Sequence, residues 1–478
     1  MPESVDAVVI GSGPNGLAAA IFLQQAGHNV LVLEAAAEPG GGTGTRELTL
    51  PGFLHDQCSA VHPTGILSPF FRRLPLGEHG LEWLQLPAGV AHPLDGQPGV
   101  ILYPDFARTL ERLDAGDRAA WQGLMQPFLR HPYGLLEALL GPLRLPRHPL
   151  MLARFGLLAL QPATFLARRR FSGARARALF AGCAAHSILP LSHLTTAAMG
   201  LVFAITAHVE SWPVARGGSA AISRSLVSFF RSLGGRIETG RRINSPGDLP
   251  PHRLALYDVS PKELIRITGN QLPAGYVRRL QRYQYGPGTF KIDWALDGPI
   301  PWKDPAMGEA TTVHVGGTME EIAASELAAW QGRVADKPYL ILCQQSAADP
   351  GRAPAGQHTG YAYCHVPFGF DGDRTRAIED QVERFAPGFR DRILARHTTT
   401  PGDFERMNPN YVGGAITGGA AHIGQLFTRP VARLDPYTTP HPRIMLCSAA
   451  TPPGGGVHGM CGYRAALTAD RRLRRRNF

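Results

Sequence analysis

The chain has 478 residues, of which 44% are hydrophobic, and it contains 55 glycines and 41 prolines. This composition excludes an intrinsically disordered chain and predicts a compact protein with two or three structural units and many tight turns. The net charge of +10 does not by itself indicate a nucleic-acid-binding protein, because no module of basic and aromatic residues recurs along the chain.

The cysteines and the N-terminus restrict the kind of site and the location that we expect. The six cysteines form no C-x-x-C pair, and the histidines do not pair at metal-ligand spacing, so no metal site is expected. The first residues lack the basic and apolar regions of a secretory signal. A cytoplasmic, reducing location is therefore expected.

The apolar segment at residues 151–167 is the candidate for contact with a membrane. Arg154, Gln161 and Pro162 interrupt it, so it is too short to span a bilayer, which takes about 18 or more apolar residues. A run of arginines follows at residues 168–170. The segment is interpreted either as core helices with a solvated flank or as helices that lie on a bilayer surface. The oligomeric state is left open.

The chain opens with the pattern of a βαβ unit. A short apolar run at residues 7–10 predicts a strand, the glycine-rich residues 11–16 predict a tight turn, and the alanine- and leucine-rich stretch after them predicts a helix. A second apolar run at residues 30–33 predicts a buried strand that ends at Glu34. All local signals in this stretch favour the same unit.

The spacing of three glycines in the first turn indicates dinucleotide binding. Gly11 permits the sharp turn after the strand, Gly13 lets the backbone approach a pyrophosphate, and Gly16 lets helix and strand pack closely. The phosphates would lie at the helix N-terminus, where free N–H groups and the helix dipole favour negative charge. The carboxylate of Glu34 can accept hydrogen bonds from ribose hydroxyls.

The middle of the chain predicts a helical region followed by a second sheet. From about residue 70 to 210 the pattern is helical and punctuated by prolines. Ser219 is a candidate N-cap for the amphipathic helix that follows it, and strand-like runs at 290–296 and 339–343 indicate a sheet. Four aromatic residues of this part are interpreted as core or as the wall of an apolar tunnel: Tyr283, Tyr285, Trp294 and Trp302.

The C-terminal part repeats the combination of strand, glycine-rich turn and helix. The apolar strand at residues 444–447 leads into the turn at 454–459, after which a helix is predicted. Such a turn places a second helix N-terminus beside a ligand. Surface loops seldom combine three glycines with apolar neighbours and an immediate helix, so we expect this turn to contact a cofactor.

These turns carry a resemblance to a known group of flavoproteins. Residues 34–42 resemble the second glycine motif of the flavin amine oxidase and phytoene dehydrogenase superfamily, and the turn at 454–459 resembles its closing motif. Five further segments resemble landmarks of a bacterial phytoene dehydrogenase-related branch, and together they span nearly the whole chain: 47–53, 55–62, 217–219, 285–288 and 408–413. One position departs from the pattern, because Gly44 stands where many relatives have an arginine and Arg46 comes two residues later.

The resemblance implies an α/β fold of the two-dinucleotide-binding-domain flavoprotein class. An FAD-binding Rossmann-like domain is then expected to carry an inserted α+β substrate domain. The FAD-binding domain would be discontinuous and consist of residues 1–70, 213–287 and 415–478. Residues 71–212 and 288–414 would form the substrate domain, whose helical part includes the candidate membrane segment.

The resemblance also implies that FAD is the cofactor. Small residues after the second strand let the chain run alongside an extended cofactor. Either Arg46 takes over the contact of the missing arginine, or that contact is absent. The expected FAD contacts lie in the three turns and in the middle segment: Gly11, Gly13, Pro14, Asn15, Gly16, Glu34, Ala35, Gly41, Gly42, Thr43, Arg46, Ile243, Gly455, Gly456, Val457, His458 and Met460.

Three residues are candidates for a catalytic role. Lys291 lies in a segment that resembles the region carrying the flavin-proximal lysine of amine oxidases, where a desolvated lysine can hold a water molecule. The alternative is an exposed lysine on a strand. His62 follows the second turn and His458 lies inside the third, and each either faces the flavin or substrate or makes a structural hydrogen bond.

Together these features predict an FAD-dependent oxidoreductase of the phytoene dehydrogenase type. It would transfer hydride between an apolar substrate, isoprenoid or lipid-like, and N5 of the flavin. The alternatives within the enzyme class are amine oxidation, polyene ketolation and redox-neutral isomerisation. A flavoprotein without catalytic activity that acts as a binding partner is an alternative of another class. No nucleic-acid ligand is expected.

Overall fold

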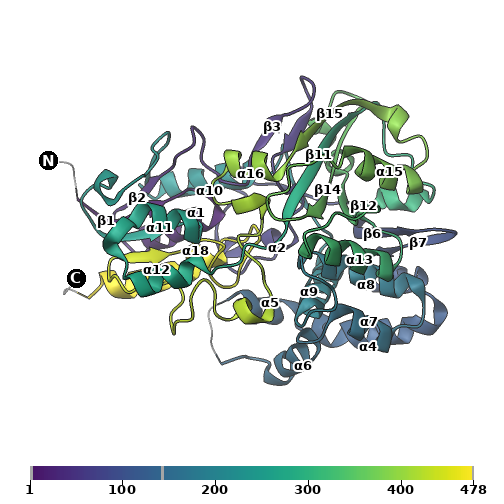
Figure 1. Ribbon diagram of the computed structural model, residues 1–478, viewed down its shortest axis with the longest axis horizontal. Coiled ribbons are helices and arrows are strands. Elements are labelled where there is room, and N and C mark those ends of the chain that lie inside the picture. The colour runs from purple at the N-terminus through teal and green to yellow at the C-terminus, as the bar shows by residue number, and fades with distance from the viewer. Residues whose placement is uncertain (1–3, 142–144, 476–478) are drawn as a thin grey trace.

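Two large β-sheets organise the chain in the computed structural model, which describes residues 4–141 and 145–475 (Figure 1). The first sheet is parallel throughout and has the strand order β16-β10-β1-β2-β9. Its strands are β1 (Val5–Ile10), β2 (Val30–Leu33), β9 (Arg236–Glu238), β10 (His252–Tyr257) and β16 (Ile444–Leu446). Segments from the beginning, the middle and the end of the chain therefore meet in one sheet.

Helices cover both faces of the parallel sheet. On one face lie α1 (Pro14–Gln25), α10 (Ala220–Ser232) and α18 (Met460–Leu473), and on the other lie α11 (Pro261–Thr268) and α12 (Ala274–Gln281). Alternate residues of β1 are buried in the two hydrophobic clusters on either side of the sheet. This double burial explains why β1 and β2 are continuous apolar runs in the sequence.

The second sheet is mixed and has the strand order β15-β11-β14-β13-β12-β6-β7, in which only β6 and β12 pair in parallel. Its strands are β6 (Ala88–Leu94), β7 (Gln97–Leu102), β11 (Gly288–Leu296), β12 (Ala310–Val315), β13 (Leu340–Cys343), β14 (His358–Val366) and β15 (Ile393–Thr399). Helix α15 (Thr375–Phe385) covers one face of this sheet. The two sheets confirm the predicted α/β fold with a Rossmann-like domain and a second, sheet-containing domain.

The prediction of a helical region from about residue 70 to 210 is wrong for residues 88–102. These residues form β6 and β7, and all seven residues of β6 are buried. Because β6 has hydrogen-bonded neighbours on both edges and is buried along its whole length, it lacks the apolar–polar alternation of a half-exposed strand. Pro93 inside the strand further obscured the pattern.

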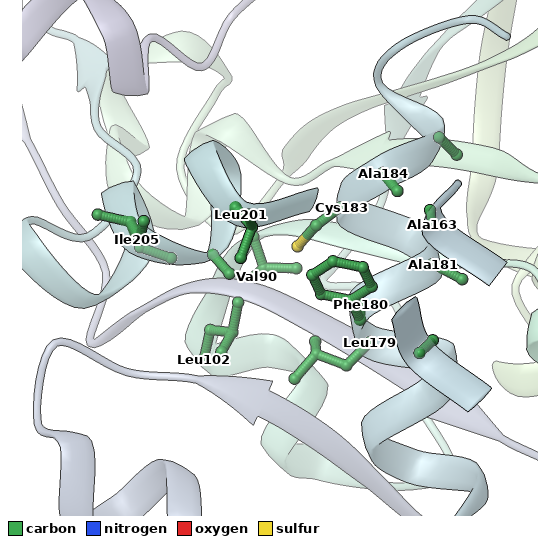
Figure 2. Close-up of a cluster of buried hydrophobic side chains, with 14 of the residues drawn as sticks. Val90, Leu102, Ala163, Leu179, Phe180, Ala181, Cys183, Ala184, Leu201 and Ile205 are labelled. Carbon is green, nitrogen blue, oxygen red and sulfur yellow. The ribbon is translucent and has the colours of Figure 1, made fainter. Parts of the chain in front are cut away.

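Helices pack against the other face of the mixed sheet. They are α3 (Phe106–Glu111), α4 (Ala115–Leu129), α5 (Pro132–Leu140), α6 (Pro149–Ala159), α7 (Ala163–Arg170), α8 (Ala174–Ala185), α9 (Thr196–Val209) and α13 (Met319–Trp330). Figure 2 shows the core of this layer, in which Phe180 and Cys183 of α8 meet Leu201 of α9 and Val90 and Leu102 of the sheet. Within the described ranges no single helix is long and apolar enough to cross a membrane; α6 and α7 meet that test only as a pair, bent by 104°.

A buried ion network joins the two domains. Strand β4 (Leu54–Asp56), which pairs with β3 (Thr45–Glu47), ends at Asp56, and this carboxylate forms an ion pair with Arg352 in which both side chains are fully buried. Asp349 accepts from Arg352 Nε at 3.1 Å and from the backbone N–H of Gly217 at 2.7 Å. Arg352 also donates to the carbonyl of Ala215 at 3.0 Å. Arg352, which lies between β13 and β14 of the mixed sheet, is thereby fixed to the loop that precedes α10.

The same aspartate satisfies the N-terminus of α10. The backbone N–H of Ser219 donates to Asp56 Oδ1 at 2.6 Å, and that of Ala220 donates to Thr45 Oγ1 at 3.1 Å. Ser219 occupies the predicted N-cap position, but its side chain makes no capping bond and donates instead to the carbonyl of Gly44 at 3.2 Å. The predicted capping by Ser219 is therefore wrong, because distant residues bind these N–H groups.

The substitution Arg352→Ala tests the energetic weight of this network. It leaves the carboxylates of Asp56 and Asp349 buried without their guanidinium partner. We expect the free energy of unfolding to fall by about 3–5 kcal/mol, measured by urea or thermal unfolding. The matched control is Arg216→Ala, which removes an exposed ion pair with Glu82 and should leave the free energy of unfolding nearly unchanged. Equal losses in the two variants would contradict this assignment.

Candidate functional site

A cavity of about 620 Å³ extends from the turn between β1 and α1 to the face of the mixed sheet. Its volume lies in the range of small-molecule binding sites, roughly 300–1,000 Å³. Residues of both domains line it, and they come from the beginning, the middle and the end of the sequence. The cavity therefore depends on the relative position of the two sheets.

The first wall is the turn between β1 and α1. Gly11 has a φ of +99°, which favours glycine, and a Cβ atom at Gly13 would lie 2.9 Å from the carboxylate of Asp258. A Cβ atom at Gly16 would lie 2.1 Å from the carbonyl oxygen of Gly11, so Gly16 permits the close packing of helix and strand. Pro14 occupies the first turn of α1. The N-terminus of α1 thus opens onto the cavity, as a phosphate site requires.

Glu34 is held rigidly beside this turn. Its carboxylate accepts hydrogen bonds from the backbone and the hydroxyl of Ser12 at 2.8 and 2.5 Å, and from the N–H of Ala36 at 2.8 Å. It lies at the carboxyl end of β2, next to β1 in the parallel sheet, and lines the cavity. A fixed carboxylate at this position can accept further hydrogen bonds from the hydroxyls of a ribose.

The other two glycine turns line the same cavity. A Cβ atom at Gly41 would lie 3.0 Å from Cα of Gly13, so the second turn packs directly against the first. The third turn, between β16 and α18, contributes Gly455, Gly456 and Val457 to the lining. A Cβ atom at Gly455 would lie 2.5 Å from the carbonyl oxygen of Thr417, so only glycine fits there.

Most of the predicted cofactor contacts line the cavity, and three do not. The lining includes Gly11, Gly13, Pro14, Asn15, Glu34, Ala35, Gly41, Gly42, Thr43, Arg46, Ile243, Gly455, Gly456 and Val457. Gly16, His458 and Met460 are not part of it. His458 Nδ1 accepts from the N–H of Met460 at 3.0 Å, so this histidine caps the start of α18 and has the structural role that was its alternative.

Lys291 does not line the cavity either. Its ammonium forms an ion pair with Asp293, donates to the carbonyl of Asp56 at 3.0 Å and lies 4.4 Å from the centre of the Tyr361 ring. The side chain is 2% exposed, so the alternative of an exposed strand lysine is wrong. Tyr361, rather than Lys291, presents its ring to the cavity. The chain thus uses Lys291 as a buried counterion.

His62 does line the cavity. It is buried, its ring lies 6.1 Å from that of Trp83, and its Nε2 has no hydrogen-bond partner in the described part of the chain. Burial lowers the pKa of His62 to about 4, so the imidazole is neutral at physiological pH. Of the three catalytic candidates, only His62 lines the cavity.

Several lining residues have no counterpart among the predictions. We call the part of the cavity next to the mixed sheet its substrate end, lined by His186, Phe203, Trp212, Ile341, Tyr361 and Tyr363. The two tyrosines alternate along β14 and share one face, which is a signal in the sequence. None of the predicted tunnel aromatics lines the cavity; Trp294 and Trp302, for example, pack in the core under α15.

Asp258, which follows β10, is another lining residue that was not predicted. Its Oδ2 accepts from the N–H of Gly16 at 2.8 Å, so a carboxyl group lies where the α1 N-terminus opens onto the cavity. Burial raises the pKa of this carboxyl to about 7, the negative charge of Glu34 also raises it, and the Gly16 N–H lowers it. The group therefore titrates near neutral pH.

Comparisons with known proteins agree with this geometry. Residues 9–74 match a family described as a NAD(P)-binding Rossmann-like domain. The pyridine nucleotide-disulfide oxidoreductase domain-containing protein 2 of Mus musculus is 27% identical, over 98% of this chain and 94% of that protein. The lycopene-forming phytoene desaturase of Pseudescherichia vulneris is 25% identical, over 97% of this chain and 98% of that protein. The structure of a redesigned putrescine oxidase, 16% identical, superposes with a TM-score of 0.62 over 98% of both chains and shares the fold.

The substitution Asp258→Asn tests the titration of this carboxyl. Its native pKa of about 7 lies above the ordinary value of 3.8, so its contribution to stability is full at low pH and is lost as the pH rises to about 7. Asparagine keeps an acceptor for the Gly16 N–H but does not ionise. We expect the variant to have a higher Tm than the wild type at about pH 8, and the difference to shrink toward about pH 4, where both residues are neutral. A difference that is independent of pH would contradict the assignment.

Proposed function

Since the chain belongs to the superfamily of FAD-dependent oxidoreductases that includes phytoene desaturases and amine oxidases, we propose that it binds FAD in this cavity and oxidises or reduces an apolar substrate. The observation that carries the proposal is that three glycine turns and Glu34 line one cavity whose other end is aromatic. Bound FAD would supply hydride transfer at its isoalloxazine ring.

The residues present fit an extended dinucleotide. The N-terminus of α1 would hold the pyrophosphate, and Glu34 would accept hydrogen bonds from the adenosine ribose. The backbone of Gly455 and Gly456 lines the part of the cavity where a flat ring would lie. His62, which is neutral and lines the cavity, would donate or accept one hydrogen bond at that ring or at the substrate.

The substrate end supports an apolar substrate over an amine. The residues that line it from 186 to 212 and from 312 to 363 include no Asp, Glu, Lys or Arg. An ammonium group would lose its water there without gaining a carboxylate. An apolar molecule loses only unfavourable hydration, and the rings of Phe203, Trp212 and Tyr361 exclude water from the reacting atoms.

We also propose that α6 and α7 contact a membrane surface, from which such a substrate could enter. Leu150 and Leu157 lie two turns apart on α6 and are 86% and 72% exposed, and Phe165 of α7 is 52% exposed. Arg154 lies between the two leucines, and exposed arginines follow at 168–170. This combination of exposed apolar and cationic side chains favours an anionic bilayer surface.

FAD binding is tested by Glu34→Gln. The loss of a charged acceptor for the ribose should raise the Kd for FAD about tenfold, measured by titration calorimetry or by flavin absorbance. Glu38→Gln is the matched control, because Glu38 also lines the cavity but is 73% exposed and pairs with Arg46. We expect Glu38→Gln to change the Kd for FAD little. A wild-type protein that binds no FAD, or a control that loses as much affinity, would argue against the proposed cradle.

The reaction is tested with the same FAD-loaded protein. Anaerobic incubation with an apolar lipid extract should bleach the visible flavin band if the protein oxidises its substrate. Turnover only after chemical reduction of the flavin would indicate saturation or isomerisation instead. If neither treatment changes the flavin or the lipids, the alternative of a flavoprotein without catalytic activity is favoured.

Membrane contact is tested by the double substitution Leu150→Ser and Leu157→Ser. Removing two exposed leucines from the interface should lower partitioning onto phosphatidylglycerol-containing vesicles by about tenfold or more, measured by flotation. Leu434→Ser is the control, since Leu434 is fully exposed elsewhere. Binding that is equal in all three proteins, or equal for anionic and neutral vesicles, would count against this surface.

A further inference from the structure

One face of the mixed sheet forms the floor of the substrate end. His314 of β12 is opposite Ile341 of β13, and Ile341 is opposite Tyr363 of β14, so the three side chains form a row across the sheet. Ile341 and Tyr363 line the cavity, whereas His314 is completely buried beside it. A titratable ring is therefore built into the sheet next to the substrate end.

His186 is the second histidine at the substrate end. It follows the last residue of α8, its ring lies 4.4 Å from that of Phe203 and 5.5 Å from that of Trp212, and its Nε2 lies 2.8 Å from Nε2 of His314. One turn earlier, a Cβ atom at Gly182 would lie 2.6 Å from Nδ1 of His314. Glycine at this position is what admits the His314 ring between helix and sheet.

Both imidazoles of the pair are neutral. Burial lowers the pKa of His186 to about 3, and the charge of His365 lowers it further. Burial holds the pKa of His314 well below its ordinary value, and the charges of His186 and His92 lower it further. Each ring therefore carries one proton. Of the two Nε2 atoms that face each other, only one carries a proton, because a hydrogen bond needs one donor and one acceptor.

The surroundings of His314 decide which ring donates. Its Nδ1 is buried and has no partner in the described part of the chain. A buried N–H group without an acceptor is rarer in proteins than a buried acceptor without a donor, so the proton of His314 lies on Nε2 and points at His186. Nε2 of His186 is then the acceptor, and the proton of His186 lies on Nδ1.

Nδ1 of His186 is free to bind a ligand. Within residues 4–141 and 145–475 it makes no hydrogen bond, and unlike Nδ1 of His314 it is not among the inaccessible unpaired atoms. His186 lines the cavity, and because its Nε2 is paired with His314, Nδ1 is the ring nitrogen left for a ligand there. A neutral N–H donor among aromatic rings suits one uncharged acceptor.

We infer that the substrate carries a carbonyl or hydroxyl oxygen on an otherwise apolar skeleton, and that Nδ1–H of His186 binds this oxygen. The inference rests on the proposed function, because it takes the aromatic end of the cavity as the substrate site. A carboxylate or an ammonium group is disfavoured at this position because the residues that line the substrate end carry no countercharge. His186 is thereby a specificity-determining residue.

The test uses four probes with the same phenylalkyl skeleton: benzylacetone, butylbenzene, phenylbutyrate and phenylbutylamine. Their Kd values are measured on cofactor-free and on FAD-loaded protein by thermal shift and by tryptophan fluorescence. We expect the ketone to bind best, and His186→Phe to weaken its binding about tenfold while leaving butylbenzene unchanged. Phe203→Leu, the matched control, should weaken all four probes alike.

The tautomers are tested independently by ¹⁵N NMR of histidine-labelled protein. The signal that disappears in His186→Phe should report a proton on Nδ1 of His186. Absence of binding by any probe, tightest binding of the acid or the amine, unchanged ketone affinity in His186→Phe, or a proton on Nε2 of His186 would each overturn the inference. A failure of FAD binding is a separate result, because ketone selectivity is also read on the cofactor-free protein.

Discussion

Asp56 and Arg352 form a fully buried ion pair between the two domains. The transfer of such charges out of water costs several kcal/mol for each ion, so the pair persists only because its remaining hydrogen-bonding positions are filled. Asp349, the carbonyl of Ala215 and the N–H of Ser219 fill them. These contacts fix the mixed sheet relative to the start of α10, and the cavity between the domains depends on that position.

The same network accounts for Lys291. The backbone carbonyl of Asp56 accepts a hydrogen bond from Lys291, and the carboxylate of Asp56 binds Arg352. Lys291 and Arg352 therefore belong to one buried cluster that also contains Asp293 and Asp349. Removing the ammonium would leave Asp293 without its ion-pair partner. The sequence contained a sign of this role, because Lys291 and Asp293 lie two residues apart on a strand and so share one face. The resemblance to a catalytic region of amine oxidases predicted a lysine near the flavin instead.

How much the sequence predicts depends on how local the cause is. The strands, turns and helices around Gly11, Gly41 and Gly455 follow from short-range patterns, and all three turns line one cavity. Strand β6 was missed because burial along its whole length removes the periodicity that identifies strands. Asp258 and His186 were missed for another reason: their importance comes only from groups that the fold brings to them, Gly16 for the first and His314 for the second.

The cavity separates two kinds of electrostatic environment along its length. The charged lining residues Glu34, Asp258 and Arg266 lie toward the parallel sheet, where a dinucleotide brings its own charges and helix α1 offers its N-terminus. The substrate end has only uncharged groups, so its effective dielectric constant is low and each hydrogen bond there is stronger than in water. In such surroundings a charged side chain would have to be paired or neutralised, whereas a histidine kept neutral by burial can donate to a ligand without that cost. The pairing of His186 with His314 is thus a way to place one directional polar contact in a site that must otherwise stay apolar.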